Sequence, residues 1–390
     1  MAVAMTVEQL WQPVPGGSGT YIRELAAALA ARGDVTLTGI RARPSDPHAS
    51  PPTPSCAQGV QRPESPNPGP VIDLPAVMQL HSSRLPRPAL YESWLRLRRP
   101  RVPGPRPDVI HATTWAVPPR SAPLVVTVHD LAFQRSPDHF TPRGVAFFNR
   151  ALEITRREAD VVIVPSQATR DDVVAAGIDP ERVRVIPHGV AAPPVTEAGA
   201  ATFRERHGLL RPYVMWCGAI EPRKNLGTLL AAFSRIVGDA DLDLVLAGPD
   251  GWGGAAADLG RRRAALPADR VHVLGALSWA DLHAAYTGAR VFAFPSLWEG
   301  FGMPVLEAQA HGVPVVTSRG TSMAEVLGGG GLLVDASDDA DLAASILAAA
   351  GERHDVLSLA ARVNAARYTW PASAEAHLAA YRDAAEGNTL

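Results

Sequence analysis

The sequence predicts an α/β protein with two doubly wound parallel sheets, each carried by its own domain. The chain has 390 residues, which is more than one hydrophobic core usually serves. Short apolar runs alternate with helical patterns along it, which is typical of a parallel sheet covered by helices on both faces. Residues 191–200, AAPPVTEAGA, have the composition of a linker between two halves.

The first half begins with the apolar run Ala2 to Val7, then a loop to Gly19 and a helical pattern that stops near Gly33. Residues 42–70 are crowded with Pro and Ser and predict an irregular surface loop. Arg96 to Pro107 predict a second irregular stretch. Beyond it we expect a helix at 142–158, a helix capped by Ser166, and strands at 109–111, 124–128, 161–164 and 183–186.

The second half has a more regular rhythm. Strands are expected at 213–217, 243–247, 271–274, 291–295, 314–317 and 332–334. Helices are expected at 225–237, 278–287, 304–311, 322–327 and 338–350. Right-handed crossovers bring the carboxyl ends of parallel strands to one edge. A ligand is therefore expected at that edge, in a cleft across which the two domains face each other.

Composition excludes several classes of protein. A formal net charge of −2 argues against a nucleic-acid binder that relies on a global positive field. The two cysteines, Cys56 and Cys217, are too few for a disulfide framework and fit a reducing compartment. No apolar run reaches the roughly 20 residues of a membrane span, and the N-terminus lacks a signal-peptide pattern. We therefore expect a soluble cytoplasmic protein.

The segment Glu299-Gly-Phe-Gly-Met-Pro-Val-Leu-Glu307 follows a predicted strand and opens a helix. Pro304 suits the first helical turn, and Gly300 and Gly302 let the backbone approach a ligand closely. The free N–H groups and the dipole of the new helix favour a diphosphate. Both carboxylates can face the same ligand and accept hydrogen bonds from its hydroxyls. The alternative is an ordinary turn with two solvated glutamates.

The segment Gly218-Ala-Ile-Glu-Pro-Arg-Lys-Asn225 also lies between a predicted strand and a predicted helix. Arg223 and Lys224 could reach a diphosphate at the strand edge and neutralise the charge of a leaving group. On the residues alone, a solvated basic surface stays open as the alternative. Asn225 is expected to cap the following helix.

Two weaker signals lie in the first half. Gly16-Gly17-Ser18-Gly19, ahead of a helix, predicts an anion-tolerant nest of N–H groups, but no glycine stands at Ile22 to complete a dinucleotide fingerprint. His129 ends a buried strand, where a lone histidine is often structural. His188 precedes Gly189 and is expected to serve the local backbone.

EGFGMPVLE resembles the paired-glutamate signature of glycosyltransferase family 4, whose members are retaining enzymes of the GT-B fold. The later segments AQAHGVPVVTS (308–318), SMAE (322–325) and GLLVD (331–335) are similar to the same family. The resemblance covers most of residues 185–350. It implies a GT-B glycosyltransferase that takes a nucleotide-sugar as its substrate and needs no catalytic metal or other cofactor.

The resemblance also implies roles for individual residues. Glu299 would contact the transferred sugar and Glu307 the nucleotide ribose. Arg223 and Lys224 would hold the donor pyrophosphate and stabilise the leaving group. The other donor-binding positions would be Gly17, Gly19, Gly300, Phe301, Gly302 and Met303.

Similar enzymes place a histidine at the position of His129, near the transferred sugar and the acceptor, and Asp130 is a candidate partner for it. They also end with a helix that crosses back to the first domain, and Trp370 to Glu386 would be that helix. The implied domains are 1–190 plus 370–390, which binds the acceptor, and 200–369, which binds the donor.

The whole pattern is most similar to mannosyltransferases that use GDP-mannose, with UDP-sugars as alternative donors. The implied reaction moves a hexose, with retention, to a glycan, lipid-linked or small-molecule acceptor. No protein nucleophile for a double displacement is evident, so a same-face route is implied, in which the departing diphosphate deprotonates the acceptor. Two other classes stay open. One is a non-catalytic nucleotide-sugar-binding partner subunit. The other is a Rossmann oxidoreductase, against which the incomplete glycine fingerprint argues.

Two further features have competing interpretations. Asp241-Leu-Asp243 spells the Asp-x-Asp of metal-dependent glycosyltransferases, but it precedes a strand, and we interpret it as a solvated turn. The segment 84–106 predicts either a basic surface loop or contact with an anionic acceptor or membrane surface, which would place the protein at the inner face of the membrane. Its arginines are Arg84, Arg87, Arg96, Arg98, Arg99, Arg101 and Arg106.

Overall fold

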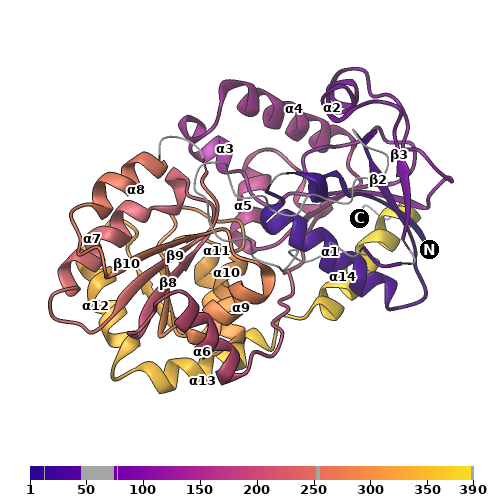
Figure 1. The fold of residues 1–390 in the computed structure, drawn as a ribbon. Helices are drawn as coiled ribbons and strands as arrows, with labels where there is room; N and C mark the ends of the chain where they lie inside the picture. Colours follow the sequence, from indigo (N-terminus) through magenta and orange to yellow (C-terminus); the bar gives the residue numbers. More distant parts are fainter. Residues whose placement is uncertain (13, 45–73, 77, 252–254, 388–390) are drawn as a thin grey trace. The chain divides into compact units, whose positions relative to one another are not determined.

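The structure, a computed structural model, describes residues 1–12, 14–44, 74–76, 78–251 and 255–387. Most of the predicted 42–70 loop lies outside these residues. The described chain divides into two compact units. The N-terminal unit holds the chain up to Gly189 together with the segment from Thr369 onward, and the C-terminal unit holds Val190–Tyr368. Each unit is a parallel sheet with its own helices (Figure 1).

Within the described residues, the N-terminal unit has a seven-stranded sheet in the order β3-β2-β1-β4-β5-β6-β7, and every neighbouring pair is parallel. Strands β4, β5 and β6 are fully buried, as expected for runs of Val and Ile covered on both faces. The strands are β1 (Ala2–Thr6), β2 (Thr36–Arg41), β3 (Gln79–Ser82), β4 (Val109–Ala112), β5 (Leu124–Thr127), β6 (Val161–Val164) and β7 (Val183–Val185).

The helices of this unit begin where the sequence supplies caps. Thr141 and Ser166 each accept a hydrogen bond from the first turn of the helix that follows, so the predicted Ser166 cap is confirmed. Helices α1 and α14 pack together (Figure 1). Helix α14 lies against β4, β5 and β6. The helices are α1 (Gly16–Ala30), α2 (Arg87–Arg96), α3 (Ala132–Arg135), α4 (Pro142–Glu158), α5 (Gln167–Ala175) and α14 (Trp370–Glu386). Short 3₁₀ turns lie at η1 (Glu8–Trp11), η2 (Pro137–His139) and η3 (Pro180–Arg182).

The described part of the C-terminal unit has a six-stranded parallel sheet in the order β10-β9-β8-β11-β12-β13. The order reverses direction between β8 and β11, and ligands of doubly wound sheets bind beside such a switch point. The strands are β8 (Tyr213–Cys217), β9 (Asp243–Ala247), β10 (Val271–Gly275), β11 (Val291–Phe294), β12 (Val315–Ser318) and β13 (Gly331–Val334).

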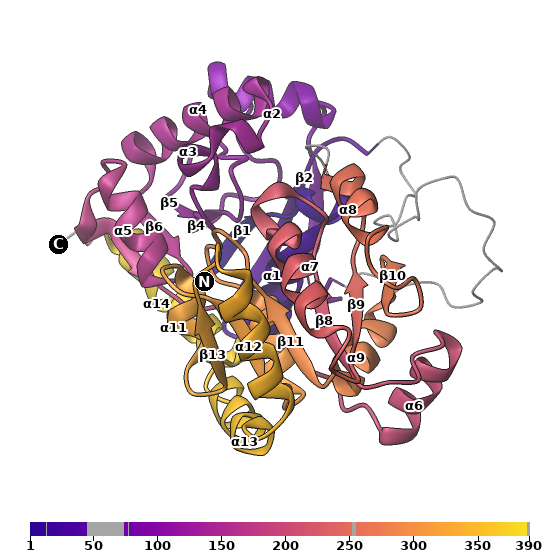
Figure 2. The same cartoon turned by 90° about the vertical axis from the view of Figure 1, so that its left-hand side faces the viewer.

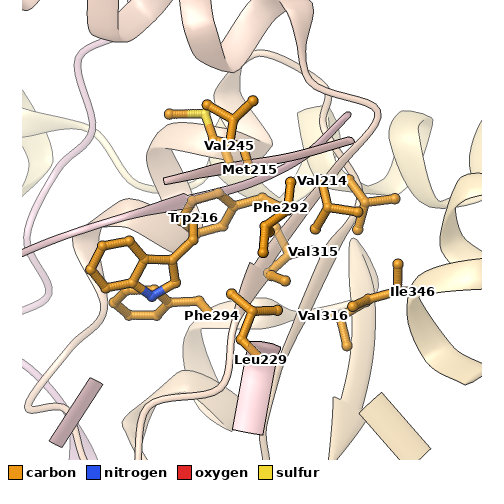
Figure 3. Close-up of a cluster of buried hydrophobic side chains, with 14 of the residues drawn as sticks. Val214, Met215, Trp216, Leu229, Val245, Phe292, Phe294, Val315, Val316 and Ile346 are labelled. Carbon is orange, nitrogen blue, oxygen red and sulfur yellow. The ribbon is translucent and has the colours of Figure 1, made fainter. Parts of the chain in front are cut away.

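Helices α7 and α12 lie side by side along one face of this sheet (Figure 2). Leu229 of α7 and Ile346 of α12 enter the core, which also holds Trp216, Phe292 and Phe294 from β8 and β11 (Figure 3). The helices are α6 (Glu197–Arg206), α7 (Leu226–Ile236), α8 (Ala255–Arg263), α9 (Trp279–Gly288), α10 (Met303–Ala310), α11 (Ser322–Leu327), α12 (Asp339–Ala350) and α13 (His354–Ala365), with a 3₁₀ turn at η4 (Pro222–Lys224).

Several elements differ from the sequence prediction. The linker is shorter than 191–200, because Thr196 caps α6 and the helix begins at Glu197. Strands β2 and β3 and helices α2, α8 and α13 were not predicted, since their apolar patterns are short or are interrupted by charged residues. No helix in the described part of the chain combines the length and the apolar composition that crossing a bilayer requires.

Candidate functional site

A cluster of charges lies at the carboxyl ends of β8 and β11, which are neighbours at the switch point of the C-terminal sheet. Lys224 Nζ lies 2.6 Å from Oε1 of Glu299, and Arg223 Nη1 lies 2.8 Å from the same oxygen. Arg223 Nη2 also lies 2.9 Å from Oε1 of Glu221. Three of the four predicted catalytic residues therefore share one site.

Burial makes this cluster electrostatically strong. The side chains of Lys224 and Glu299 are only 8% and 10% exposed. Burial alone would raise the pKa of Glu299, but Arg223 and Lys224 outweigh it and lower that pKa to about 2. Burial lowers the pKa of Lys224, and the Glu299 carboxylate opposes that shift. Lys224 Nζ also lies 4.7 Å above the ring of Phe294.

Backbone contacts fix the two loops that carry these charges. Leu297 N donates to the Arg223 carbonyl at 2.8 Å, and Ser322 Oγ donates to the Glu299 carbonyl at 2.7 Å. Asn225 stands at the N-cap position of α7, but its side chain makes no capping hydrogen bond. Its Nδ2 donates instead to the Pro295 and Ala336 carbonyls, so the predicted capping role is wrong and the residue joins three loops.

The N-terminus of α10 borders the same cluster. Gly302 is its N-cap residue and has φ 89°, a left-handed conformation that favours glycine. No side chain caps α10, but Pro304 has no N–H and Val305 N already donates to the Gly302 carbonyl at 2.9 Å. What this end offers an anion is the positive end of the helix dipole and the Met303 N–H. Of the other predicted donor-binding residues here, Gly300 and Phe301 are buried and Met303 is half-buried.

Glu307 lies in α10, eight residues after Glu299. Its Oε2 accepts a hydrogen bond from the hydroxyl of Tyr286, in α9, at 3.0 Å. Burial, followed by the nearby Cys217 and Glu307, raises the pKa of Tyr286, which keeps the phenol protonated as a donor. The two glutamates of the motif therefore have different partners: Glu299 faces cations and Glu307 a phenol.

His129, the fourth predicted catalytic residue, lies in the N-terminal unit just after β5. Its Nε2 is 3.0 Å from the Thr113 carbonyl, and because a carbonyl only accepts, Nε2 carries the hydrogen. Burial lowers the pKa of His129, which favours a neutral ring with a lone pair on Nδ1. Asp130 acts on this ring through its negative charge, which opposes the effect of burial on the pKa of His129. Its Oδ1 accepts a hydrogen bond from the Ala132 N–H.

The glycine-rich segment differs from the predicted loop. Helix α1 begins at Gly16, so Gly17 and Gly19 lie in its first turn rather than ahead of it. Gly19 is buried, and a Cβ there would overlap the side chain of Pro15. Close packing therefore explains Gly19, and any anion binding here would use the uncapped helix terminus.

Asp243 is not a solvated residue, which corrects the sequence interpretation. Its side chain is 1% exposed, and it lies 3.0 Å from Arg270 Nε and 3.2 Å from His272 Nε2. Asp241 is exposed and pairs with Arg211 at 3.2 Å. Across the described residues, no group of three or more His, Cys, Asp or Glu side chains is arranged to hold a metal ion.

The arginines of the basic segment 84–106 have different environments, and one of them has a structural role. Arg98 pairs with Glu158 at 2.7 Å and donates to the carbonyls of Trp94, Val117 and Pro118. Arg96 pairs with Glu92. Four others are exposed on the surface: Arg84, Arg99, Arg101 and Arg106.

Sequence reasoning missed Glu221, Tyr286 and the environment of His188. Glu221 stands two residues before Arg223, so its position in the motif could have been noticed. Tyr286 could not, because it meets Glu307 only through the packing of α9 against α10. His188 does more than serve the backbone: its ring is buried and stacks on Trp370, with centroids 6.1 Å apart.

Comparison with known families identifies both halves of the chain. The model described as Glycosyltransferase Family 4 matches residues 15–192. The model described as Glycosyl transferases group 1 matches residues 211–351. The two matches together span most of the chain.

Individual relatives agree. D-inositol 3-phosphate glycosyltransferase of Geodermatophilus obscurus is 31% identical over 402 residues, covering 95% of this chain and 85% of that protein. O-antigen chain mannosyltransferase B of Escherichia coli is 29% identical over 250 residues, and the match spans 61% of this chain and 64% of that protein. HepE of Anabaena, solved with UDP and glucose, superposes with a TM-score of 0.72 at 18% identity, covering 97% of this chain and 98% of HepE. This likeness shows the fold, two Rossmann-like domains of the GT-B class, and confirms the predicted fold class.

Proposed function

The chain belongs to glycosyltransferase family 4, and from that premise we propose that it transfers mannose from GDP-mannose to a hydroxyl acceptor with retention of configuration. The observation that supports this most is the convergence of Arg223 and Lys224 on Glu299 at the sheet switch point. Two cations and a carboxylate there match the needs of a reaction in which a diphosphate leaves a sugar.

In this proposal the two cations stabilise the charge that develops on the departing diphosphate. Glu299 orients the sugar by accepting hydrogen bonds from its hydroxyls, and its low pKa keeps it an acceptor throughout. The N-terminus of α10 adds its helix dipole and the Met303 N–H for the phosphates. Glu307 binds the ribose hydroxyls, with Tyr286 holding one of its oxygens.

His129 has a defined part in this scheme. Because Nε2–H is bound to the Thr113 carbonyl, only Nδ1 can meet a substrate, and in the neutral ring it can only accept a hydrogen bond. We therefore assign His129 as an acceptor for a hydroxyl of the sugar or the acceptor. It does not serve as a cation for phosphate.

The donor assignment is supported by the motif pattern and by the likeness to O-antigen chain mannosyltransferase B. A UDP-sugar is the alternative, and HepE, which shares the fold, was solved with UDP. The acceptor is proposed to be a glycan, a lipid-linked glycan or a small molecule. The D-inositol 3-phosphate glycosyltransferase relatives show that family members of similar length act on a small phosphorylated alcohol.

Donor hydrolysis in the absence of acceptor tests the proposal without knowledge of the acceptor. The protein is incubated with GDP-mannose, UDP-glucose or UDP-N-acetylglucosamine, and the released sugar is followed by proton NMR before it mutarotates. Release of mannose from GDP-mannose, as the α anomer first, is the expected result. Release from a UDP-sugar alone would overturn the mannose assignment, and β-anomer product would overturn retention. Binding of a donor without turnover would favour the non-catalytic partner subunit, and no binding of any donor would overturn the proposal.

We also propose that the protein works in the cytoplasm without a metal and contacts anionic membrane surfaces through the exposed arginines of 84–106. Leu97, 69% exposed beside them, adds an apolar contact. Cosedimentation with phosphatidylglycerol vesicles tests this. Changing Arg99, Arg101 and Arg106 to Gln should weaken binding at about 1 kcal/mol per arginine. The matched control changes three exposed arginines of α8, Arg261, Arg262 and Arg263, and an equal loss there would contradict the proposed surface.

A further inference from the structure

A chain of hydrogen bonds between buried side chains runs through the N-terminal unit close to His129. Tyr381 of α14 bonds to His111 of β4, and His111 bonds to Thr127 of β5. Thr127 bonds in turn to Tyr21 of α1, and Tyr21 to His377 of α14. His377 Nδ1 ends the chain on the carbonyl of Ser373 at 2.7 Å. These five side chains are at most 1% exposed, so water does not compete for their bonds.

The donor and the acceptor of each hydrogen bond can be deduced from the last bond of this hydrogen-bond chain, the one to the Ser373 carbonyl. A carbonyl only accepts, so His377 carries its hydrogen on Nδ1 and offers a lone pair on Nε2. Burial, only partly opposed by the bond to Ser373, lowers the pKa of His377 to about 4, which keeps the ring neutral. Tyr21 must then donate to His377 across 2.8 Å, and its oxygen must accept from the Thr127 hydroxyl across 2.9 Å.

The same reasoning continues to the other end. The single hydrogen of Thr127 is given to Tyr21, so Thr127 accepts from Nε2–H of His111 at 2.8 Å. Burial, together with His377 and His129, lowers the pKa of His111, so Nδ1 is a lone pair and accepts from the Tyr381 hydroxyl at 2.8 Å. The two histidines therefore hold opposite tautomers, His377 with Nδ1–H and His111 with Nε2–H.

The central residue of this hydrogen-bond chain, Tyr21, contacts His129, the histidine to which the proposed function gives a substrate contact. The ring of Tyr21 meets His129 edge-on with centroids 4.9 Å apart, and it meets His188 at 4.7 Å. His129 and His188 are themselves 5.4 Å apart. The Tyr21 hydroxyl is held by two bonds within the chain, so the ring has little freedom to rotate or withdraw.

We propose that Tyr21 is a positioning residue: its locked ring holds His129 in the orientation that presents Nδ1 to a substrate hydroxyl. The positioning role of Tyr21 rests on the function proposed for His129. The hydrogen-bond chain and its tautomers do not depend on that function. The groups that face Tyr21 are neutral ones, namely Thr127 and the imidazoles of His111, His129, His188 and His377. Asp130 is the carboxylate that acts on His129.

The hydrogen-bond chain is tested by NMR on the full-length protein labelled with ¹⁵N at histidine, with signals assigned by their loss in the H111N, H129N and H377N variants. Long-range ¹H–¹⁵N correlations distinguish the two neutral tautomers. At pH 7 we expect Nδ1–H for His377 and Nε2–H for His111 and His129. A charged ring, or Nε2–H on His377, would overturn the order derived above whatever the protein catalyses.

The positioning role is tested by kinetics with the donor that the protein turns over. Tyr21→Leu removes the ring and should lower kcat about tenfold or more, with the KM for donor changed less than about threefold. Tyr381→Phe breaks the chain at its far end without touching His129, and it should leave kcat within about twofold. In a His129→Ala background, Tyr21→Leu should have almost no further effect on kcat.

Additive losses in that background would overturn the role, and so would an equal loss of kcat in Tyr381→Phe. Tyr21→Phe guards against misfolding, since it keeps the ring. Because it removes the hydroxyl that locks the ring, it should lower kcat by about threefold, less than Tyr21→Leu does, while the His377 signals change. If the wild type turns over no donor, the proposed function fails, and with it the positioning role. The NMR result would still decide the hydrogen-bond chain independently.

Discussion

One oxygen of Glu299, Oε1, lies within 2.6 Å of Lys224 Nζ and within 2.8 Å of Arg223 Nη1. Without a ligand, the carboxylate therefore pairs with both cations that we assign to the diphosphate, and Glu221 supplies the second negative charge beside Arg223. Burying these four charges together is tolerable only because each has a partner. An incoming diphosphate must exchange with Glu299 for these cations, and the freed carboxylate can then accept from the sugar.

Glu299→Gln tests this exchange. The amide keeps the shape of the side chain but removes the charge that competes with phosphate. We expect kcat to fall by about 100-fold or more. Calorimetric titration should show that the affinity for GDP is unchanged or higher. Arg235→Gln, which removes an exposed pair with Asp339, is the control and should leave both quantities within about twofold. Loss of GDP affinity with an unchanged kcat would contradict the exchange.

Glu307→Ala should act on binding instead of turnover. Removing a charged acceptor of ribose hydroxyls costs about 1.5–3 kcal/mol, which corresponds to a rise in Kd for GDP of roughly 10-fold to 100-fold. Tyr286→Phe removes only the support of one carboxylate oxygen and should raise Kd less. Titration with GDP measures both variants. A Kd unchanged in Glu307→Ala would remove this residue from the donor site.

Acid should destabilise the protein through its buried histidines. The pKa of His377 is lowered to about 4 chiefly by burial, whereas in an unfolded chain it returns to about 6.5. Between about pH 6.5 and pH 4, this histidine is therefore protonated in the unfolded state but neutral in the folded state. The free energy of unfolding falls as the pH drops toward 4, by about 2 kcal/mol at pH 5 from His377 alone. Denaturant titrations at pH 7 and pH 5 measure this, and His377→Gln should show a shallower dependence. Equal dependence in variant and wild type would refute it.

Chelation should have no effect on transfer. The Asp-x-Asp motif does not present its carboxylates to a ligand, because Asp243 is committed to Arg270 and His272. We expect EDTA to leave the initial rate unchanged. Asp243→Asn should instead reduce the free energy of unfolding by about 3–5 kcal/mol, because it leaves the largely buried guanidinium of Arg270 without its carboxylate partner. A rate that EDTA abolishes and Mg²⁺ restores would contradict the absence of a metal requirement.

Local patterns predicted much of the fold. Runs such as Val161–Val164 are apolar and β-branched along their whole length, which predicts buried strands. The helices that were predicted in the second half lie within two residues of their observed bounds, whereas α6, α8 and α13 were missed. Helix α2 was missed because arginines and prolines surround its few buried residues. Asp243 and Arg270 are brought together only when the chain folds, and their spacing in the sequence does not predict that they pair.

The sequence predicted those residues of the candidate site that belong to short motifs. It did not predict those that are brought together only by contacts in the folded chain. Arg223, Lys224 and Glu299 could be named because each belongs to a short motif. That all three would meet at one oxygen depends on β8 pairing with β11. The chain from Tyr381 to Ser373 joins residues from α1, β4, β5 and α14, and in the sequence each of its histidines looks like an isolated core residue.

A nucleotide thermal-shift panel tests the central claim most directly. GDP, UDP, ADP and NAD are each added at ~100 times a typical dissociation constant to the wild type and to Glu307→Ala. A bound ligand at that concentration adds about 2.7 kcal/mol to the free energy of unfolding. We predict that GDP raises the unfolding temperature of the wild type and does so less in the variant. A rise in the unfolding temperature with UDP alone would support the transferase function but replace GDP-mannose with a UDP-sugar as the donor. No response to any nucleoside diphosphate, or a response to NAD alone, would contradict the account.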